Sequence, residues 1–407
     1  MGGRWQALEE GFGNGGGIFA AGRAAEAIAL FDEVRASEPV LQIADRLWLV
    51  TRYDDARAIL RNPRFSSNDQ VALTGDPTAA SLADPTRYML FQDPPHHTRL
   101  RALVQQAFSP RRIRQMEADV ERAVDVLLDA VAGAGTMDLI AELARPLPVN
   151  VICAMLDVPE ADREAIRGYA EDSSLLLDHD FIDEATLARA VSGSQALRDY
   201  FRILIEQRRK APGDDILSDL IAAEEAGSTL STEEIVTMAD LLFVAGHETT
   251  VNLIGNGMLA MLETPGSLER MAAEPDTIPL AVEESLRFAP SVTLNGRYAL
   301  EDLPVGGTVI PMGHEVFIPL DAVNRDPARF DDPHRFDVGR RENPHLTFSI
   351  GPHVCLGAGL ARLEARVVWR RMLARLGGWR LTAPVRYREH ITLRGLEALP
   401  VAFAAAS

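Results

Sequence analysis

The segment around Cys355 combines residue types that suit a thiolate metal ligand. It reads Phe348-Ser349-Ile350-Gly351-Pro352-His353-Val354-Cys355-Leu356-Gly357 and leads into a helical run. A Cys just before a helix feels the positive end of the helix dipole and nearby amide donors, which favour the thiolate. Gly351 and Gly357 let the backbone approach a flat ligand closely. A lone Cys among apolar residues is usually a packed core thiol, so it is this surrounding pattern that favours a ligand.

A second group of polar residues interrupts the apolar stretch LLFVAGHETTVN. Gly246, Glu248, Thr249 and Thr250 stand there among apolar neighbours, and buried polar groups cost free energy unless they have partners. A hydroxyl beside a carboxylate can organise water and deliver protons. A helical Thr also often bonds back to the preceding turn, and for Thr249 both interpretations can hold. His247 is expected to face a neighbouring helix and to have no catalytic role.

The loop around Cys355 resembles the haem-binding loop of cytochromes P-450. The resemblance implies that the Cys355 thiolate is the axial ligand of haem iron, where the sulfur donates electron density and promotes O–O cleavage. Ser349 departs from the pattern, because bacterial members usually carry a second Gly there. We expect a small change in the hairpin and no loss of haem. The positions that match the family are Phe348, Gly351, His353, Cys355 and Gly357.

The polar stretch resembles the oxygen-binding part of the same family. Ala245-Gly246-His247-Glu248-Thr249-Thr250 stands in the family's order, well before the Cys355 loop. The resemblance implies that Ala245 and Gly246 leave space over the iron. It also implies that Glu248 and Thr249 are the catalytic acid and alcohol pair.

Two further motifs imply structural and haem-binding roles. Glu284 and Arg287 match the family's Glu-x-x-Arg, and Arg335 in Pro333-His334-Arg335-Phe336 matches the second Arg of its structural triad. The segment Asp93-Pro94-Pro95-His96-His97 resembles the one that opens a helix over one haem edge. Cationic donors suit carboxylates, and the implied donors to the haem propionates are His97, Arg101, Arg297 and His353.

Helical patterns dominate the elements that must position these residues. Apolar residues recur at three- and four-residue spacing over 116–133, 142–156, 160–174, 185–209 and 231–263, and the clearest strands are 48–51, 309–311 and 316–318. Ser231 and Glu234 form a capping box at the start of the longest helix, and Pro265 closes its end. The sequence therefore predicts a mainly α fold. The resemblance implies the triangular cytochrome P-450 fold, with a long central helix and a minor β region, in a single domain over 21–407 behind a flexible Gly-rich arm at 1–20.

Composition excludes several classes of function. Lys and Arg number 41 against 59 Asp and Glu, and the net charge of −18 argues against nucleic acid or an anionic membrane surface as the main partner. The amino terminus has neither the basic start nor the apolar run of a signal peptide or membrane anchor. The two cysteines, Cys153 and Cys355, have no paired spacing, so we expect a reducing cytoplasm and a core position for Cys153.

The resemblance implies a haem b enzyme that inserts one oxygen atom from O2 into a lipophilic small molecule, most often by hydroxylation. Electrons would come from a separate ferredoxin and its NAD(P)H-dependent reductase, and the enzyme would be a monomer in a bacterial cytoplasm. Two alternatives are a peroxide-driven relative and a haem-binding sensor without turnover. The intact Glu248 and Thr249 pair disfavours both.

The substrate is the least determined part of the prediction. A terpenoid, steroid, fatty acid derivative or polyketide would suit the apolar pocket that family resemblance implies at Phe243, Val244, Val292, Thr293, Leu294, Thr392 and Leu393. Lids are expected over about 66–90 and 172–192. A basic patch for an acidic ferredoxin is expected from Arg99, Arg111, Arg112, Arg114, Arg362 and Arg366.

Overall fold

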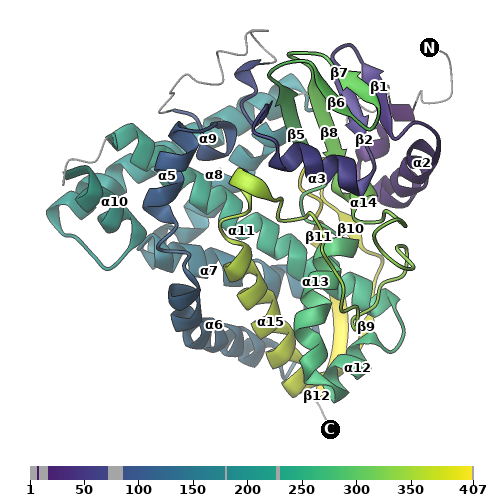
Figure 1. Ribbon diagram of the computed structural model, residues 1–407. Coiled ribbons are helices and arrows are strands. Elements are labelled where there is room, and N and C mark those ends of the chain that lie inside the picture. Colours follow the sequence, from purple (N-terminus) through teal and green to yellow (C-terminus); the bar gives the residue numbers. More distant parts are fainter. Residues whose placement is uncertain (1–6, 9–16, 72–85, 179–180, 226–229, 406–407) are drawn as a thin grey trace.

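The computed structural model describes residues 7–8, 17–71, 86–178, 181–225 and 230–405. Helices make up most of this part of the chain, as the sequence predicts, and a small sheet lies at one corner beside α2 and α3 (Figure 1). The helices are α2 (Ala24–Ser37), α3 (Tyr53–Arg61), α5 (His96–Val104), α6 (Pro110–Val131), α7 (Pro146–Met155), α8 (Arg163–Ser174), α9 (Glu184–Lys210), α10 (Ile216–Glu225), α11 (Thr232–Glu263), α12 (Ser267–Ala273), α13 (Ile278–Phe288), α14 (Leu320–Val323) and α15 (Ala358–Arg375).

The central helix is α11, and its start follows from a local signal. The Ser231 hydroxyl accepts the backbone N–H of Glu234, and the Glu234 carboxylate accepts the N–H of Ser231, so the predicted capping box is present. The helix has 32 residues, which gives a length of about 48 Å. It runs through the middle of the molecule and packs against α7, α9, α13 and α15 (Figure 1). Most of its side chains are therefore buried.

The main sheet has the strand order β1-β2-β8-β5-β3. Strand β2 runs parallel to β8, and β5 runs antiparallel to β8 with Arg297 opposite Val316. The three predicted strands are confirmed in β2, β7 and β8. The strands are β1 (Val40–Ala44), β2 (Leu47–Val50), β3 (Phe65–Ser66), β4 (Thr136–Asp138), β5 (Leu294–Ala299), β6 (Leu303–Val305), β7 (Thr308–Ile310), β8 (Glu315–Pro319), β9 (Leu376–Leu381), β10 (Arg386–Tyr387), β11 (Leu396–Ala398) and β12 (Pro400–Ala405).

A ladder of ion pairs joins α6 to α15, the helix that follows the Cys355 loop. Acidic side chains recur every four residues on α6, so they lie on one face of that helix. Arg370 lies 3.2 Å from Glu117, and Arg375 lies 3.2 Å from Asp125. Partly exposed pairs of this kind contribute roughly 0.2–1 kcal/mol each. The ladder pairs Glu117, Glu121, Asp125 and Asp129 with Arg366, Arg370, Arg371 and Arg375.

The predicted arm and lids fall partly outside the described residues. In the arm at 1–20, residues 1–6 and 9–16 are outside, but Leu8, Ile18 and Phe19 are buried in an apolar cluster with α2. A loose arm is therefore wrong at those three positions, because their side chains bury apolar surface. Of the lids, 72–85 and 179–180 are outside. The rest of 172–192 continues α8, the short helix Leu175–Asp178 and the start of α9.

We find no helix in the described ranges with the length and apolar character that crossing a membrane requires.

Candidate functional site

The Cys355 loop is held by its own backbone. The N–H of Cys355 donates to the carbonyl of Phe348 (2.8 Å), which closes the loop just before α15. Gly351 has φ +76°, and a Cβ there would lie 2.7 Å from the carbonyl oxygen of Leu60. Only glycine fits that close approach. Ser349 also lies in the left-handed region, with φ 55°, which explains why the family usually has a Gly at this position.

The Cys355 thiol lies among groups that favour a thiolate. It is accessible to solvent and yet enclosed by the surrounding chain. Burial raises the pKa of Cys355, and the net direction is up, although hydrogen bonds from the N–H groups of Gly357 and Ala358 and the charges of Arg101 and Arg362 lower it. Binding a metal ion removes the thiol proton, so amide donors and nearby cations stabilise the ligated form.

The four predicted propionate donors lie together beside Cys355. The rings of His97 and His353 are 4.1 Å apart, and His353 is repelled by His97, Arg297 and Arg101. Burial and these charges lower the pKa of His353 to about 2, and burial lowers that of Arg297 to about 10. Strand β5 carries Arg297, and α5 carries His97 and Arg101.

This cluster has more basic groups than carboxylates. That excess suits haem, because haem carries two propionate carboxylates. The nearest carboxylate is Asp93, 4.0 Å from Nε2 of His353. Neither Nδ1 of His97 nor Nε2 of His353 has a hydrogen-bond partner among the described residues. Buried donors without partners are costly. A ligand with two carboxylates, as haem has, would satisfy them, and the sulfur of Cys355 is the soft ligand its iron takes.

The middle of α11 turns one face toward accessible space. Ala245 is exposed and Thr249 is half-buried, although almost all of their neighbours on the helix are buried. Ala245 and Thr249 are four residues apart, so they share a face. Gly246 is half-buried beside Ala245. A Cβ on it would lie 3.3 Å from Ile152 of α7, so its small size serves the packing of α11 against α7.

Thr249 and Glu248 make defined contacts. The Thr249 hydroxyl donates to the carbonyl of Ala245 (2.8 Å), so the back-bonded arrangement is present. The Thr249 carbonyl in turn accepts the hydroxyl of Ser291 (2.8 Å). Glu248 is buried, and its Oε1 accepts a hydrogen bond from Arg388. Sequence reasoning missed Ser291 and Arg388, because both are distant in the chain from the residues they contact and neither belongs to a motif.

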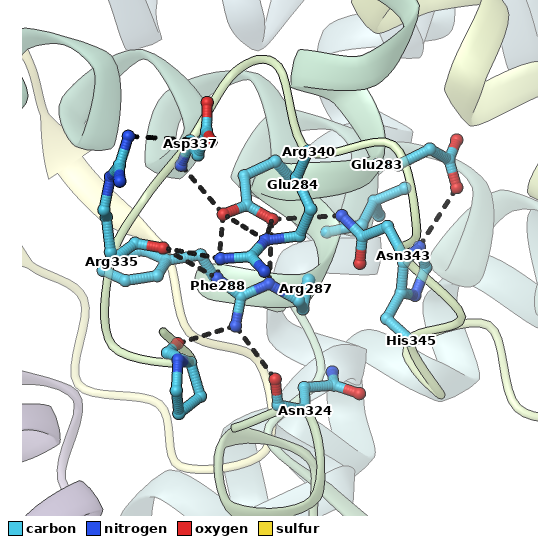
Figure 2. A network of polar contacts seen from close by, with 12 residues as sticks. Glu283, Glu284, Arg287, Phe288, Asn324, Arg335, Asp337, Arg340, Asn343 and His345 are labelled. Atoms are coloured by element: carbon cyan, nitrogen blue, oxygen red, sulfur yellow. Dashed lines mark hydrogen bonds and ion pairs between the residues drawn. The ribbon is translucent and has the colours of Figure 1, made fainter. Parts of the chain in front are cut away.

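The structural triad contains a different second arginine from the predicted one. Glu284 is fully buried and binds Arg287 at 2.8 Å, as predicted. Its other guanidinium partner is Arg340, at 3.0 Å, and Figure 2 shows the contacts of the Glu284 carboxylate with both arginines. The prediction that Arg335 belongs to the structural triad is wrong. Its side chain is 67% exposed and reaches Asp337, and only its backbone carbonyl accepts from Arg287 (3.1 Å).

The predicted pocket residues divide into two groups. Val292 bridges to Leu393, and the N–H of Thr293 donates to the carbonyl of Thr392 (3.0 Å), so these four lie together. Leu294 begins β5 beside them, and Val244 is buried next to Ala245. Phe243 does not fit a pocket wall. Its fully buried ring packs against Phe201 and His247, with centroids 6.2 and 5.3 Å away, because it lies two positions before Ala245 and so on the other side of the helix.

Two predicted core residues occupy the positions expected. Cys153 is fully buried on α7, and burial raises its pKa to about 12. His247 is buried, and its Nδ1 lies 2.7 Å from the carbonyl of Phe243. Both belong to the packing between α11 and its neighbours.

The predicted basic patch is reduced by ion pairs. Arg99 pairs with Glu234, Arg362 with Glu283 (2.6 Å), and Arg366 with Glu117 (3.5 Å). Arg111, Arg112 and Arg114 remain exposed on the first turns of α6. Of these, Arg112 approaches the highly exposed Asp214 at 3.5 Å.

Ser349→Gly is expected to stabilise the protein. The left-handed conformation costs a residue with a Cβ roughly 1–2 kcal/mol, and the greater chain entropy of Gly offsets part of the gain. The Ser349 hydroxyl also has no hydrogen-bond partner in the described part of the chain. Denaturant unfolding should therefore show a gain of about 1 kcal/mol. Ser349→Ala is the control and should gain less, because it keeps the Cβ; an equal gain would contradict the role of φ.

Comparison with known proteins identifies many relatives. The sequence model of the family "Cytochrome P450" matches residues 44–377. The chain is 40% identical over 369 residues to "Cytochrome P450 107B1" of Saccharopolyspora erythraea, covering 87% of this chain and 88% of that one. It is also 40% identical to "Cytochrome P450 monooxygenase PikC" of Streptomyces venezuelae, over 93% and 91% of the two chains. The ligand-free structure of CYP164A2 from Mycobacterium smegmatis matches with a TM-score of 0.85 and 38% identity, over 95% and 98%.

Proposed function

The chain belongs to the cytochrome P450 family of haem-thiolate monooxygenases, and on that premise we propose that it inserts one oxygen atom from O2 into an uncharged, lipophilic small molecule. Hydroxylation is the expected outcome. The observation that carries the proposal is the arrangement around Cys355. There an accessible thiol, beside amide donors, lies next to four basic side chains. These four have fewer carboxylate partners among the described residues than they could bind.

Residues from four parts of the chain, namely α5, α11, β5 and the Cys355 loop, would hold haem b. Cys355 would be the axial ligand, and His97, Arg101, Arg297 and His353 would bind the propionates. When bound, haem supplies the activation of O2 and the oxidation of the C–H bond. By family resemblance, the walls of the site would come from Ala245, Gly246, Phe348, Gly351 and Gly357.

The residues of α11 would supply protons. The reaction needs two protons and two electrons, since the second oxygen atom leaves as water. The Thr249 hydroxyl uses its own proton in the bond to Ala245, so its lone pairs are free to accept from water. Glu248 is the neighbouring carboxylate that would hold the next proton.

Thr249→Ala is expected to uncouple the reaction. Substrate binding and NAD(P)H consumption should persist, while reducing equivalents go to hydrogen peroxide, because no hydroxyl remains at this position to hold water. Positioned proton transfer typically contributes 100-fold or more, so product per NAD(P)H should fall by at least about tenfold. Product and peroxide measured together decide this, with Thr249→Ser as the control that keeps the hydroxyl. Unchanged product yield in Thr249→Ala would contradict the assignment.

The substrate class follows from apolar surroundings and from relatives. Thr293 and Thr392 use their hydroxyls on the carbonyls of Ile391 (2.6 Å) and Leu177 (3.3 Å), so the predicted pocket offers few free polar groups. The relatives include a "Vitamin D(3) 25-hydroxylase" of Pseudonocardia autotrophica at 40% identity and a "Polyketide biosynthesis cytochrome P450 PksS" of Bacillus subtilis at 38%. Matching structures hold testosterone and myristic acid. These favour a steroid, terpenoid, fatty acid derivative or polyketide.

A ligand screen with turnover would test the proposal. Testosterone, vitamin D3, myristic acid and a macrolactone would be titrated into the haem protein, and a shift from low to high spin identifies a ligand. The best ligand should then stimulate NAD(P)H consumption and yield an oxygenated product. A haem protein that binds ligands without consuming NAD(P)H would be a sensor or carrier. Turnover with hydrogen peroxide but not with NAD(P)H would indicate the peroxide-driven alternative.

Electrons would come from a separate acidic ferredoxin and its reductase in a bacterial cytoplasm. Both cysteines are free, which suits a reducing compartment. The exposed arginines on the first turns of α6 are the strongest candidates for the docking surface. The positive end of the α6 dipole lies at the same place.

Arg112→Glu is expected to slow reduction by ferredoxin, most of all at low ionic strength. Reversing one charge in a steering patch lowers the association rate by about tenfold or less, and salt screens the effect. Substrate affinity and the absorbance spectrum should not change. Stopped-flow reduction across a salt series measures this. Arg122→Glu is the control, because Arg122 is exposed further along the same helix; equal slowing by both variants would remove Arg112 from the docking surface.

A further inference from the structure

A single arginine from near the carboxyl end of the chain holds the acid of α11. Oε1 of Glu248 accepts a hydrogen bond from Nη1 of Arg388, and the two residues form an ion pair. The Glu248 side chain is 2% exposed and that of Arg388 is 25% exposed. Oε2 of Glu248 is buried and has no hydrogen-bond partner among the described residues. One carboxylate oxygen is therefore fixed, and the other is left to bind water.

Arg388 belongs to a segment that follows a polar stripe on α11. Glu248, Asn252 and Asn256 recur every four residues and are all buried, so they lie on one face of the helix. Asn256 donates to the carbonyl of Arg394 (3.0 Å), and a Cβ on Gly395 would lie 1.9 Å from Oδ1 of Asn252. The stripe thus meets the segment 388–395 along its length.

The same segment is fixed on its other side by Asp178, at the end of the short helix after α8. Asp178 is buried, and its two oxygens accept the N–H groups of Ile391 (2.7 Å) and Thr392 (2.9 Å). Nδ1 of His390 lies 2.5 Å from the same carboxylate. Burial raises the pKa of Asp178, but the contacts with His390 and these N–H groups outweigh it, and the net direction is down. The charged carboxylate therefore anchors the backbone from which Arg388 extends.

We propose that Arg388 is a positioning residue for oxygen activation, which fixes one oxygen of Glu248 so that the other presents water to Thr249. The proposal rests on the proposed function. Arg388 would touch neither substrate nor haem and would act only through Glu248. Its partial exposure also connects the buried carboxylate to the surface, from which protons must come.

The test compares substitutions at Arg388 in the haem protein, supplied with a plant-type ferredoxin, its NADPH-dependent reductase and either testosterone or myristic acid. Arg388→Gln should raise the share of electrons lost to peroxide by at least about threefold and increase the solvent deuterium isotope effect on turnover. Arg388→Lys keeps the charge and should restore part of the yield. Arg386→Gln is the matched control, since Arg386 lies two residues away with its side chain 71% exposed.

A double-mutant cycle separates positioning from general damage to the fold. Arg388→Gln combined with Glu248→Gln should be no more than about twofold worse than Glu248→Gln alone, because residues that act as one unit are not additive. The shifts in unfolding midpoint should likewise be non-additive. Additive effects in both, or an Arg388→Gln protein that matches Arg386→Gln, would overturn the inference while leaving the monooxygenase function intact. A wild-type protein that converts neither compound nor any other in the screen would overturn the proposed function itself.

Discussion

Cys355→Ser is expected to abolish the red-shifted absorbance band of the ferrous carbon monoxide complex and, with it, turnover. A Ser hydroxyl keeps the position of the side chain but is not a thiolate, so the electron donation that characterises the family is lost. Losing an outer partner of a metal ligand costs about 10–100-fold in activity, so losing the ligand should cost more than about 100-fold. The amide donors of Gly357 and Ala358 remain in place in this variant.

The measurement is the carbon monoxide difference spectrum, with haem content determined separately. Cys153→Ser is the control, because Cys153 is the other cysteine and is fully buried on α7. It should keep the band even if it lowers stability. A Cys355→Ser protein that kept the band would show that another residue binds the iron.

Glu284→Gln is expected to destabilise the fold by about 3–5 kcal/mol, because it leaves the buried guanidinium of Arg287 and the half-buried one of Arg340 without their carboxylate. Glu284 and Arg287 are both fully buried, and Arg340 adds a second cation at 3.0 Å. Asn343 and the N–H of Asp337 also donate to the carboxylate, at 3.0 and 2.9 Å (Figure 2). The side-chain amide of the variant would turn one NH2 group toward these donors, from which it cannot accept a hydrogen bond.

Urea unfolding of the haem protein, followed both by CD and by haem absorbance, measures the loss of unfolding free energy. Arg335→Ala provides the sharpest comparison, since that side chain is exposed and should change stability by no more than about 0.5 kcal/mol. Arg340→Ala should fall between the two. Equal losses in Arg335→Ala and Arg340→Ala would contradict the network seen in Figure 2.

The fold and the haem ligand could be predicted because their signals are local. The capping box of α11 needs only Ser231 and Glu234, and the loop before α15 needs only a few residues around Cys355. The sequence also marks the position of Ser349, whose φ is left-handed, because it departs there from the Gly of the family pattern. Local signals of this kind do not depend on how distant segments meet.

The predictions that failed depend on which of several nearby residues faces a partner. Arg335 and Arg340 are five residues apart in one loop, and motif spacing favours the first, whereas the loop directs the second toward Glu284. Phe243 is near Ala245 in sequence, but the helical turn of about 100° per residue points its ring at α9. The pair of Glu248 with Arg388 spans two distant segments, so no sequence pattern marks it.

The ladder between α6 and α15 also shapes how the molecule would meet a charged partner in solution. The acids along α6 are matched by the arginines of α15, so they do not cancel the positive charge of Arg111, Arg112 and Arg114 at the start of the same helix. The chain as a whole has a net charge of −18, but its positive charge is concentrated at the start of α6. This separation of positive from negative charge gives the molecule a dipole. In the field of an acidic protein such a dipole experiences a torque, which would turn this face toward the partner before the two surfaces touch.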